Sequence, residues 1–475
     1  MLRNELICMK ATGITIVKYI RAIWLICLVI AGCTVPNNRK FTGKNGEIKL
    51  IILNPGDFHA SLVQKNIHPQ IDSTVYVYAP QGNDLDLHLF RIESFNKRKI
   101  NPTNWNTIVY KGADFKEKML EEQPGNLVII AGNNNSKIHY IQECINAGLN
   151  VLTSNPMIIS KQQFHQLRES FRVAREKDVL LYDAMAKRQE ITNMLQRDLS
   201  QISELFGHLE NGTPENPAII QENTNYFYKT ISGLPVVRPP WFFDINQEGE
   251  GLANTGSHLV DLVQWQCFPQ QIINYEREIA IIRATHWATP VSLTQFKQVT
   301  LSDTIPSYLK EFMRDTTFHI LSNGEMLYRI KDVYAKVKVQ WNFDNNEDHD
   351  DIHYAVMRGT RANLIVRQGP NEDYKPTLYI EPVSKTNGQS FEKAIQLATS
   401  KMQAKYKNLA IVKRGKLWEV KIPDVYKAGY ETHFEQVVEK YLHSLKEGSL
   451  PEWEVPNILA KYYTITQALE MAAKK

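Results

Sequence analysis

The chain has 475 residues, of which 43% are apolar and 22% are charged. At about 100–200 residues per domain, this length predicts two or three domains. The apolar share supplies a sizeable core, which excludes a globally disordered chain. Lys and Arg (55) exceed Asp and Glu (51) by only four, and most of this excess lies in residues 1–32. The composition therefore gives no basic stripe and no indication of a nucleic-acid partner.

The first thirty residues are typical of a secretory signal. Ile23–Ile30 is a short apolar run that follows basic residues, and it is too short for the ~20 residues that span a bilayer. The run ends in small residues before Cys33, a pattern that resembles a bacterial lipobox. We predict a lipoprotein signal peptide over 1–32, lipidation of Cys33, a polar tether over 33–47, and an extracytoplasmic, lipid-anchored protein. A buried hydrophobic helix is the alternative.

Only two cysteines, Cys144 and Cys267, follow the predicted lipobox. Two cysteines do not make a disulfide framework. We expect both to be reduced and buried in the core, because that is the commonest place for a free cysteine.

From residue 48 to residue 185, short β-branched runs alternate with helical patterns. This alternation predicts a doubly wound parallel sheet, which binds ligands at the carboxyl ends of its strands. The expected strands are Lys49–Leu53, Thr74–Ala79, Thr107–Tyr110, Asn126–Ala131, Asn150–Thr153 and Val179–Tyr182, and the expected helices are Phe58–Lys65, Leu85–Lys97, Phe115–Glu122, Lys137–Ala147 and Lys161–Glu176.

The loop after the first strand is where a dinucleotide fold holds a pyrophosphate with backbone N–H groups. Only Gly56 of the usual three glycines is present, flanked by Asn54 and His59. Pro55 removes one N–H group from the loop. An ordinary strand–helix turn is therefore an equal alternative. After the second strand, Gln81 and the later Asp84 are the candidates to bind ribose hydroxyls.

Several later stretches carry a family resemblance. They are Val128–Asn135, Ala147–Pro156, Trp241–Asp244, Gly249–Gly251 and Asn254–Leu262. In this order they resemble the glucose–fructose oxidoreductase and inositol dehydrogenase (Gfo/Idh/MocA) family. Within it, the chain resembles a Bacteroidetes-type lipoprotein branch with a "putative oxidoreductase C-terminal domain", in which an Asp-Pro-Gly-x-Phe-His-Ala-like loop replaces the glycine fingerprint.

The resemblance implies an α/β protein with two domains. A Rossmann domain over 48–185 would be followed by an α+β domain over 186–475 with an open, mostly antiparallel sheet. The pattern after residue 217 agrees with this. Strand-like runs are Ala218–Gln221, Ile279–Arg283, Lys336–Trp341, Tyr354–Gly359, Asn363–Arg367, Thr377–Glu381, Ala410–Val412 and Trp418–Lys421, and two amphipathic helices, Tyr430–Glu447 and Asn457–Ala473, close the chain.

Members of this family oxidise or reduce a carbinol carbon of a sugar or cyclitol with NAD or NADP. The resemblance implies that a lysine, an aspartate and a histidine handle the proton. In this sequence those positions hold Asn155, Asn254 and His258. Because an amide does not titrate, two of the three expected proton-handling groups are neutral. His258 could also be a hydrogen-bonded core residue, although its motif favours an active-site position.

The resemblance and the strand ends together give a wider set of candidate residues. Alternatives remain for several of them, since Asn133 and Asn135 could cap a helix, Asp261 could orient one, and Trp241 could lie in the core. The predicted cofactor-binding residues are Asn54, Gly56, Asp57, Phe58, His59, Gln81, Asn133, Asn135, Asn155 and Pro156, and the predicted substrate-binding residues are Lys187, Trp241 and Asp261.

An acidic stretch, Asp344–Asp351, invites a calcium interpretation. Asp344, Asn346 and Asp348 have the odd-position spacing of an EF-hand. His349 stands at the glycine position, and the bidentate glutamate is missing because Ala355 stands in its place. We therefore expect a solvated acidic loop and no metal site.

Three functions follow from these patterns. The first is an NAD(P)-dependent sugar oxidoreductase with a tightly held cofactor. The second is a catalytically lapsed lipoprotein that binds a glycan or a protein partner, which the amides at 155 and 254 favour. The third is a lyase or hydratase, for which the sequence shows no separate motif. Restoring lysine at 155 and aspartate at 254 should raise hydride transfer if the neutral site limits activity. The resemblance also implies a homo-oligomer.

Overall fold

The computed structural model describes residues 41–231, 234–343, 351–383 and 388–474. The predicted signal peptide, Cys33 and most of the tether lie outside the described residues, as does the acidic stretch apart from Asp351. The end of the predicted tether is packed rather than free. Phe41 is buried, and the backbone N–H groups of Thr42 and Gly43 donate to the Glu47 carboxylate.

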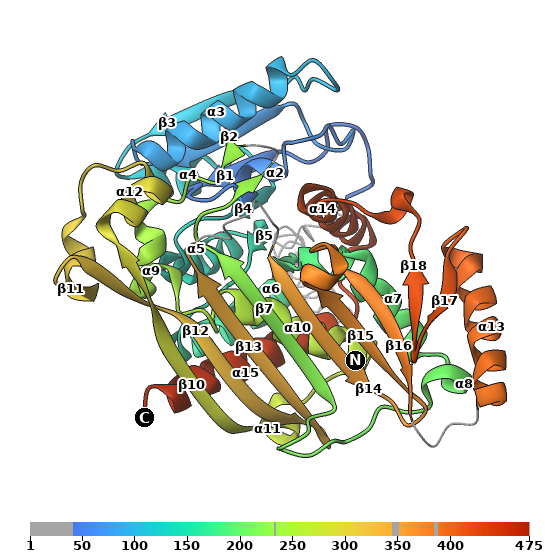
Figure 1. Ribbon diagram of the computed structural model, residues 1–475. Helices are drawn as coiled ribbons and strands as arrows, with labels where there is room; N and C mark the ends of the chain where they lie inside the picture. Colours follow the sequence, from blue (N-terminus) through green and yellow to red (C-terminus); the bar gives the residue numbers. More distant parts are fainter. Residues whose placement is uncertain (1–40, 232–233, 344–350, 384–387, 475) are drawn as a thin grey trace, which may run out of the picture. The chain divides into compact units, whose positions relative to one another are not determined.

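The first sheet has six parallel strands in the order β3-β2-β1-β4-β5-β6. The order reverses between β1 and β4, which is the place where a doubly wound sheet binds its ligands. The central strands are apolar and fully buried, because helices cover both of their faces (Figure 1). The strands are β1 (Leu50–Leu53), β2 (Thr74–Ala79), β3 (Asn106–Lys111), β4 (Leu127–Ile130), β5 (Asn150–Ser154) and β6 (Leu181–Ala184).

The helices between these strands differ from the prediction mainly at their ends. Helix α2 stops at Leu62, before the predicted end at Lys65, and the Ser61 hydroxyl bonds back to the Phe58 carbonyl in its first turn. Helix α5 begins three residues early, because the Asn133 side chain caps it by accepting from the N–H groups of Asn135 and Ser136. The helices are α2 (His59–Leu62), α3 (Asn83–Lys97), α4 (Phe115–Glu122), α5 (Asn134–Asn146) and α6 (Phe164–Glu176).

The second sheet has ten strands, and its main path runs β10-β12-β13-β7-β14-β15-β16-β18-β17. All described pairs are antiparallel except β13 with β7, which confirms a mostly antiparallel sheet. A short strand, β11 (Met313–Arg314), pairs with β12. The others are β7 (Ile219–Tyr226), β10 (Ile279–Ser292), β12 (Thr317–Ile330), β13 (Val333–Asn342), β14 (Ile352–Arg358), β15 (Ala362–Gln368), β16 (Thr377–Pro382), β17 (Ala410–Arg414) and β18 (Leu417–Lys421).

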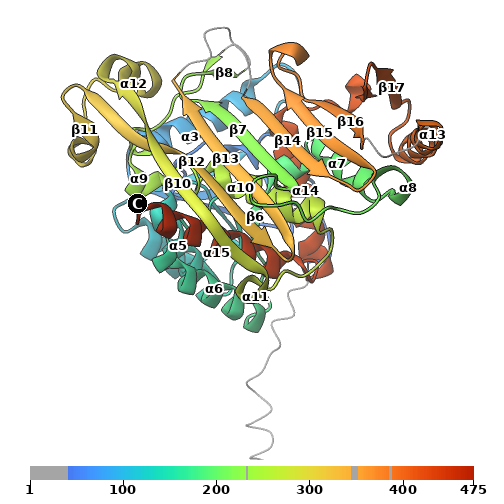
Figure 2. The ribbon, with the colours of Figure 1, turned by 60° about the horizontal axis from the view of Figure 1, so that its bottom comes forward.

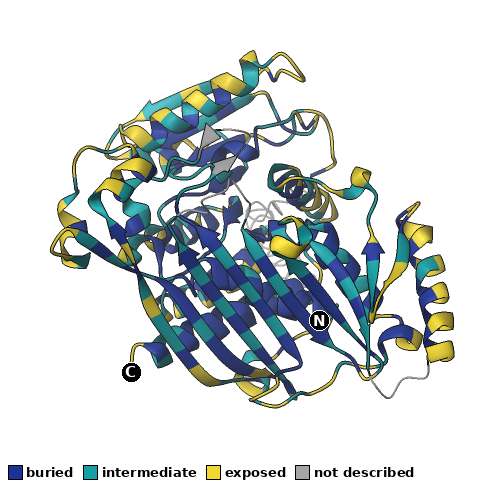
Figure 3. Cartoon of the chain, viewed as in Figure 1, coloured by how far each residue is buried: buried dark blue, intermediate teal, exposed yellow. Residues whose placement is uncertain are grey.

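Two long helices pack against one face of this sheet. Figures 1 and 2 show α10 (Thr255–Cys267) and α15 (Glu454–Ala472) behind β10, β12 and β13. Burial alternates along the strands, as expected when one face is covered, and β7 and β13 show this pattern in Figure 3. The remaining helices are α7 (Ile191–Ser200), α8 (Ser203–Phe206), α9 (Ile245–Glu248), α11 (Tyr275–Glu278), α12 (Leu293–Thr300) and α13 (Gly388–Lys405).

Helix α14 (Tyr430–Glu447) returns from the end of the chain to the first sheet. Its apolar residues share one buried cluster with β1, β2 and β4. The ring of Tyr441 stacks on Tyr182 at 5.6 Å, and its hydroxyl donates to the carbonyls of Val151 and Leu180 at 3.2 and 3.0 Å. The core of the parallel sheet therefore contains residues that lie far beyond the predicted boundary at 185.

Two further expectations concern the cysteines and the membrane. Cys144 is free and buried, as predicted. Cys267 is free but only partly buried, so that part of the prediction is wrong; as the last residue of α10 it lines a surface cavity. Within residues 41–474 as far as the structure describes them, no helix combines the length and the apolar character needed to cross a bilayer.

Candidate active site

Two glycines bring the loops after β1 and β4 into backbone contact. A Cβ atom on Gly132 would lie 2.7 Å from the Asn54 carbonyl oxygen and 2.9 Å from the Gly56 nitrogen. A Cβ on Gly56 would lie 3.0 Å from the Gly132 Cα atom. The N–H groups of Gly56 and Asp57 both donate to the Ala131 carbonyl, at 2.9 and 3.4 Å. Glycine is therefore required at this edge, and two of the N–H groups of the loop are already used within the protein.

The same loop carries a hydrogen-bonded pair, Asp57 and His59, that α14 supports. The Nδ1 atom of His59 lies 2.7 Å from the Asp57 carboxylate, and its Nε2 atom lies 2.8 Å from the Tyr430 hydroxyl. Burial alone would raise the pKa of Asp57, but His59 beside it brings that pKa below its usual value. Phe58 stacks on His59 with ring centroids 4.1 Å apart. A negative charge therefore stands at the start of α2.

A segment before α10 lies over this edge of the first sheet. Trp241 contacts Gly56, since a Cβ there would lie 3.1 Å from the indole, and its Nε1 donates to the Asp84 carboxylate at 2.9 Å. Further along, the Asn133 amide donates to Gln247 at 2.6 Å. Trp241 is thus placed beside the candidate cofactor residues that follow β1 and β2, and its contact with substrate stays a prediction.

The two amides at the expected proton-handling positions meet at the start of α10. The Asn155 side-chain NH2 donates to the Ser257 hydroxyl and, at 3.3 Å, to the Asn254 carbonyl. The Asn155 oxygen accepts from the Tyr462 hydroxyl at 3.1 Å. The peptide bond between Asn155 and Pro156 is cis. Asn155 therefore joins β5, α10 and α15 through neutral hydrogen bonds.

His258 lies one helical turn beyond Asn254 on α10, so the two side chains share a face of the helix. It is partly exposed, and its Nδ1 atom is buried and has no hydrogen-bond partner among the described residues. Burial, and then the positive charge of Lys187 and Lys461, holds the pKa of His258 well below its usual value. The imidazole is therefore neutral at pH 7 and offers an unused ring nitrogen.

Beneath these amides lies a buried network of charges. The Asp183 carboxylate accepts from the Tyr462 hydroxyl and from the Lys461 ammonium, both at 2.6 Å. Arg188 forms two bonds of 2.6 Å to Asp261 and is also paired with Glu454. All of these charged side chains are nearly inaccessible. Asp261, a predicted substrate residue, therefore has both oxygens engaged by Arg188 inside the protein.

Lys187 reaches the covered face of the second sheet from the segment after β6. Its ammonium donates to Asn223 on β7 at 3.1 Å, and burial lowers its pKa. His353 on β14 is the register partner of Asn223, and both of its ring nitrogens are buried without a partner in the described structure. Burial and then Lys187 lower the pKa of His353 to about 3. Unused hydrogen-bonding groups thus gather between β7, β14 and the His258 region.

A second pair of buried charges lies between α5 and α9. Lys137 is fully buried, and its ammonium donates to Asn134 Oδ1 and the Ser154 carbonyl, both at 2.8 Å. The Glu248 carboxylate accepts from the amides of Asn134, at 3.0 Å, and Asn254. Burial lowers the pKa of Lys137 to about 8, while burial and then Asp57 raise the pKa of Glu248 to about 8.

The structure separates the predicted residues into two groups. The first group lies at the ends of β1, β4 and β5, or on the segment before α10 and the first turns of α10, which lie over these ends. Its members are Asn54, Gly56, Asp57, Phe58, His59, Asn133, Asn155, Pro156, Trp241, Asn254 and His258. The second group does not contact this cluster. Gln81 is exposed to solvent, and the Asn135 side chain accepts a hydrogen bond from Gln163 at 2.9 Å. Sequence reasoning missed Lys137, Glu248, Tyr430, Lys461 and Tyr462. Of these, only Lys137 had a signal in the sequence, since it is a charged residue at a position that the helical pattern predicts to be buried.

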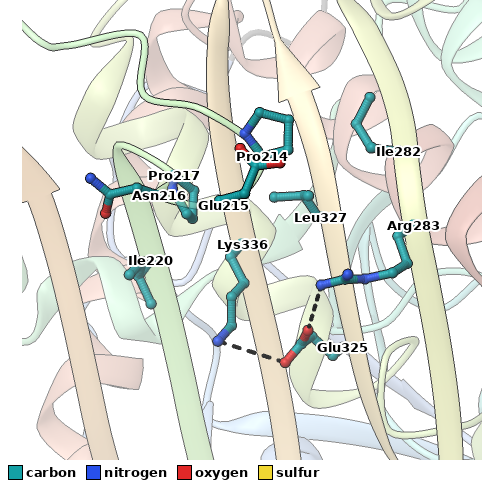
Figure 4. Close-up of a pocket in the computed structure, with 10 residues that line it drawn as sticks. All are labelled: Pro214, Glu215, Asn216, Pro217, Ile220, Ile282, Arg283, Glu325, Leu327 and Lys336. Carbon is teal, nitrogen blue, oxygen red and sulfur yellow. Dashed lines mark ion pairs between the residues drawn. The ribbon is translucent and has the colours of Figure 1, made fainter.

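A surface cavity of about 570 Å3 lies away from this cluster. Ile220 lines it, and the next residue of β7, Gln221, points to the opposite, covered face of the sheet. Glu325 also lines the cavity and forms ion pairs with Arg283 and Lys336 at 3.5 and 3.6 Å (Figure 4). The cavity is therefore on the other side of the second sheet from His258.

Comparison with known proteins gives a family for most of the chain after the first sheet and a solved structure that is similar over nearly the whole chain. A family model described as "Putative oxidoreductase C terminal domain" matches residues 195–473. A solved structure described as a "putative oxidoreductase" from Parabacteroides merdae is 48% identical, with a TM-score of 0.91 over 92% of this chain and 100% of that chain. No curated protein matches the chain.

More distant solved structures share the fold alone. A levoglucosan dehydrogenase in complex with NADH and levoglucosan is 12% identical, with a TM-score of 0.58 over 90% of this chain and 97% of that chain. A 3-ketoreductase from Actinomadura kijaniata, in complex with NADP and TDP-benzene, is also 12% identical, with a TM-score of 0.54 over 90% of this chain and 97% of that chain.

Proposed function

Because the chain belongs to the family described as "Putative oxidoreductase C terminal domain", we propose that it is an NAD(P)-dependent oxidoreductase that acts on a sugar or sugar derivative and holds its cofactor tightly. One observation carries this proposal. Asn155 stands at the end of β5, the strand next to β4 at the switch point, and its hydrogen bonds join this edge of the sheet to the first turn of the helix that carries His258. The edge where we expect the cofactor and the expected proton-handling residue are thus joined through one side chain.

The residues at this edge fit a dinucleotide. Gly56 and Gly132 let the loops after β1 and β4 approach closely at the switch point, which is where a doubly wound sheet binds a dinucleotide. Asp84 follows β2, where a ribose is expected, and Trp241 holds it there. Because the N–H groups of Gly56 and Asp57 donate to Ala131, other donors have to bind the phosphates.

The protein's own part in the reaction is to bind a hydroxyl and move its proton. A bound nicotinamide supplies the chemistry of hydride transfer. His258 is neutral and has an unpartnered Nδ1, so it can accept the hydroxyl proton. Lys187 is partly exposed, and its ammonium, which Asn223 holds, is the candidate to bind another hydroxyl of the sugar. Asn155 fixes the first turn of α10 and thereby the position of His258.

The second candidate function is a catalytically lapsed lipoprotein that binds a glycan or a protein partner. The amides at 155 and 254 favour it, because an amide does not titrate and both are already hydrogen-bonded within the protein. The negative charge of Asp57 at the start of α2 also favours it, since a phosphate would be repelled there.

Release of the bound cofactor decides between these functions. Residues 34–475 are purified without added nucleotide and denatured, and the released small molecules are identified by mass spectrometry. Stoichiometric NAD(H) or NADP(H) is the expected result. An empty protein that also shows no thermal shift with NADH or NADPH would contradict the oxidoreductase proposal and leave the lapsed lipoprotein.

We also propose that the protein is anchored outside the cytoplasm through a lipid on Cys33, with no nucleic-acid partner and with assembly into a homo-oligomer. The lipobox-like sequence supports the anchor. A position outside the cytoplasm constrains the chemistry, because soluble NAD(P) is not regenerated freely there. A tightly bound cofactor that is both oxidised and reduced within one catalytic cycle meets this constraint. Incorporation of labelled fatty acid into the full chain, lost in Cys33→Ala, is the test.

A further inference from the structure

Lys137 and Glu248 are buried ionisable side chains that do not touch each other. Lys137 is fully buried and Glu248 is 7% exposed. In the part of the chain that the structure describes, neither side chain forms a direct ion pair. Instead the amide of Asn134 stands between them, at 2.8 Å from Lys137 and 3.0 Å from Glu248. Burying two charges is costly unless their remaining hydrogen-bonding capacity is met, so this arrangement calls for a reason.

The hydrogen bonds that run from Lys137 through Asn134 and Glu248 to Asn254 have a fixed direction. The Lys137 nitrogen donates to the Asn134 side-chain oxygen, and both oxygens of Glu248 accept, as those of a carboxylate do. Asn134 must therefore turn its oxygen to Lys137 and its NH2 group to Glu248. The other oxygen of Glu248 is bound to the Asn254 side chain, which must donate through its own NH2 group. An amide orientation that is ordinarily ambiguous is thus set by the chemistry of its neighbours.

This direction determines which end of Asn254 is left free. Its NH2 group is engaged by Glu248, and its side-chain oxygen has no partner among the described residues. Asn254 is partly exposed and lies one helical turn from His258. The group that Asn254 offers beside His258 is therefore an acceptor.

We propose that Glu248 is a positioning residue that, held by Asn134 and Lys137, turns the Asn254 side chain so that its oxygen accepts a hydrogen bond from a substrate hydroxyl. This inference rests on the proposed function, which supplies the sugar. It accounts for the amide at 254, because an aspartate carboxylate has no NH2 group to donate to Glu248. It also narrows the substrate to one whose hydroxyl group donates at this position.

A double-mutant cycle tests the proposal. Glu248→Gln leaves an NH2 group facing the NH2 group of Asn254, which then has to turn over. Asn254→Asp brings two carboxylates together. The double variant Glu248→Gln/Asn254→Asp satisfies every bond, since the introduced glutamine side chain would accept from Asn134 and donate to the introduced aspartate. Unfolding midpoints are measured without ligand between pH 7 and pH 9, because the pKa values of Glu248 and Lys137 both lie at about 8.

We expect both single variants to lower the midpoint, Asn254→Asp by more, and the double variant to restore it. The matched control is Glu250→Gln/Asn254→Asp, which has the same charge; Glu250 bonds to His286 instead, so no rescue is expected. Additive effects in the cycle would overturn the proposal.

The functional measurement separates this inference from the proposed function. NADH affinity, from fluorescence titration, is expected to be equal in all these chains. For a sugar that is turned over, Glu248→Gln should raise KM at least tenfold, and the double variant should bring it back within about threefold. An unchanged KM in Glu248→Gln contradicts the positioning role. If no chain binds NADH, the proposed function fails, and the coupling between the unfolding midpoints alone decides the orientation of Asn254.

Discussion

Gly132→Ala is the most informative single change at the cofactor edge. The new methyl group would lie 2.7 Å from the Asn54 carbonyl oxygen and 2.9 Å from the Gly56 nitrogen. Both of these neighbours are backbone atoms, so the loop after β1 has to move as a whole. Overpacking of this kind costs about 1–3 kcal/mol. Since this loop is the proposed dinucleotide surface, its displacement should also weaken NADH binding at least tenfold.

Gly82→Ala is the matched control for this change. Gly82 follows β2 at the same edge, its backbone is extended at φ 168°, and a Cβ there meets nothing within 4 Å. It should lose no more than about 1 kcal/mol, the value of a helix cap, and should keep its NADH affinity. Urea denaturation and NADH fluorescence titration measure both effects. A Gly132→Ala protein with the stability and NADH affinity of the unaltered chain would refute the argument.

Four further predictions concern charged and titratable groups. Lys461→Met should cost about 3–5 kcal/mol, because it leaves the buried Asp183 carboxylate without its cation, whereas Lys405→Met at the exposed Asp198 pair should cost under about 1 kcal/mol in the same denaturation experiment. The pKa of Glu248 is raised from 4.5 to about 8, so the contribution of Glu248 to folding stability is present at low pH and is lost as pH rises from 4.5 to about 8. Over this range the free energy of unfolding of the unaltered chain, relative to that of Glu248→Gln, should fall by up to about 1.4 kcal/mol per pH unit. A difference that does not change with pH would contradict the raised pKa. His258→Asn should lower sugar turnover by about 10²-fold or more with an unchanged unfolding midpoint, because Nδ1 has no bond to lose. Asn155→Lys/Asn254→Asp should not raise hydride transfer unless Glu248→Gln is added, and a gain in rate without it would show that the two carboxylates tolerate each other.

The sequence predicted the parallel sheet well, because its strands are short, apolar and separated by amphipathic helices. It missed β12, which carries Ser322, Asn323 and Gly324 in its middle. These residues are typical of a turn, but here they accommodate the segment before α10. A Cβ on Gly324 would lie 2.5 Å from the Leu252 side chain, and one on Gly251 would lie 1.8 Å from the Ser322 carbonyl oxygen. Close tertiary packing, which a local pattern does not carry, selects these residues.

The candidate site was predictable where it follows strand ends and motifs. The loop at Gly56, the Asn155–Pro156 pair and His258 were found in this way, and their roles stay predictions. Lys137 and Glu248 could not be found, because they belong to elements distant in sequence and touch the site through Asn134 and Asn254. The same holds for Tyr430 and Tyr462, which reach the site from the last two helices.

Transfer of a labelled hydride tests the central claim most directly. The purified protein, with its bound nucleotide or with added NAD or NADP, is incubated with sugars that carry deuterium on a carbinol carbon, and the nucleotide is then analysed by mass spectrometry. The account predicts deuterium in the nicotinamide ring, and its loss in His258→Asn. Bound nucleotide that gains no deuterium from any sugar of a broad panel would contradict an oxidoreductase and favour a protein that only binds.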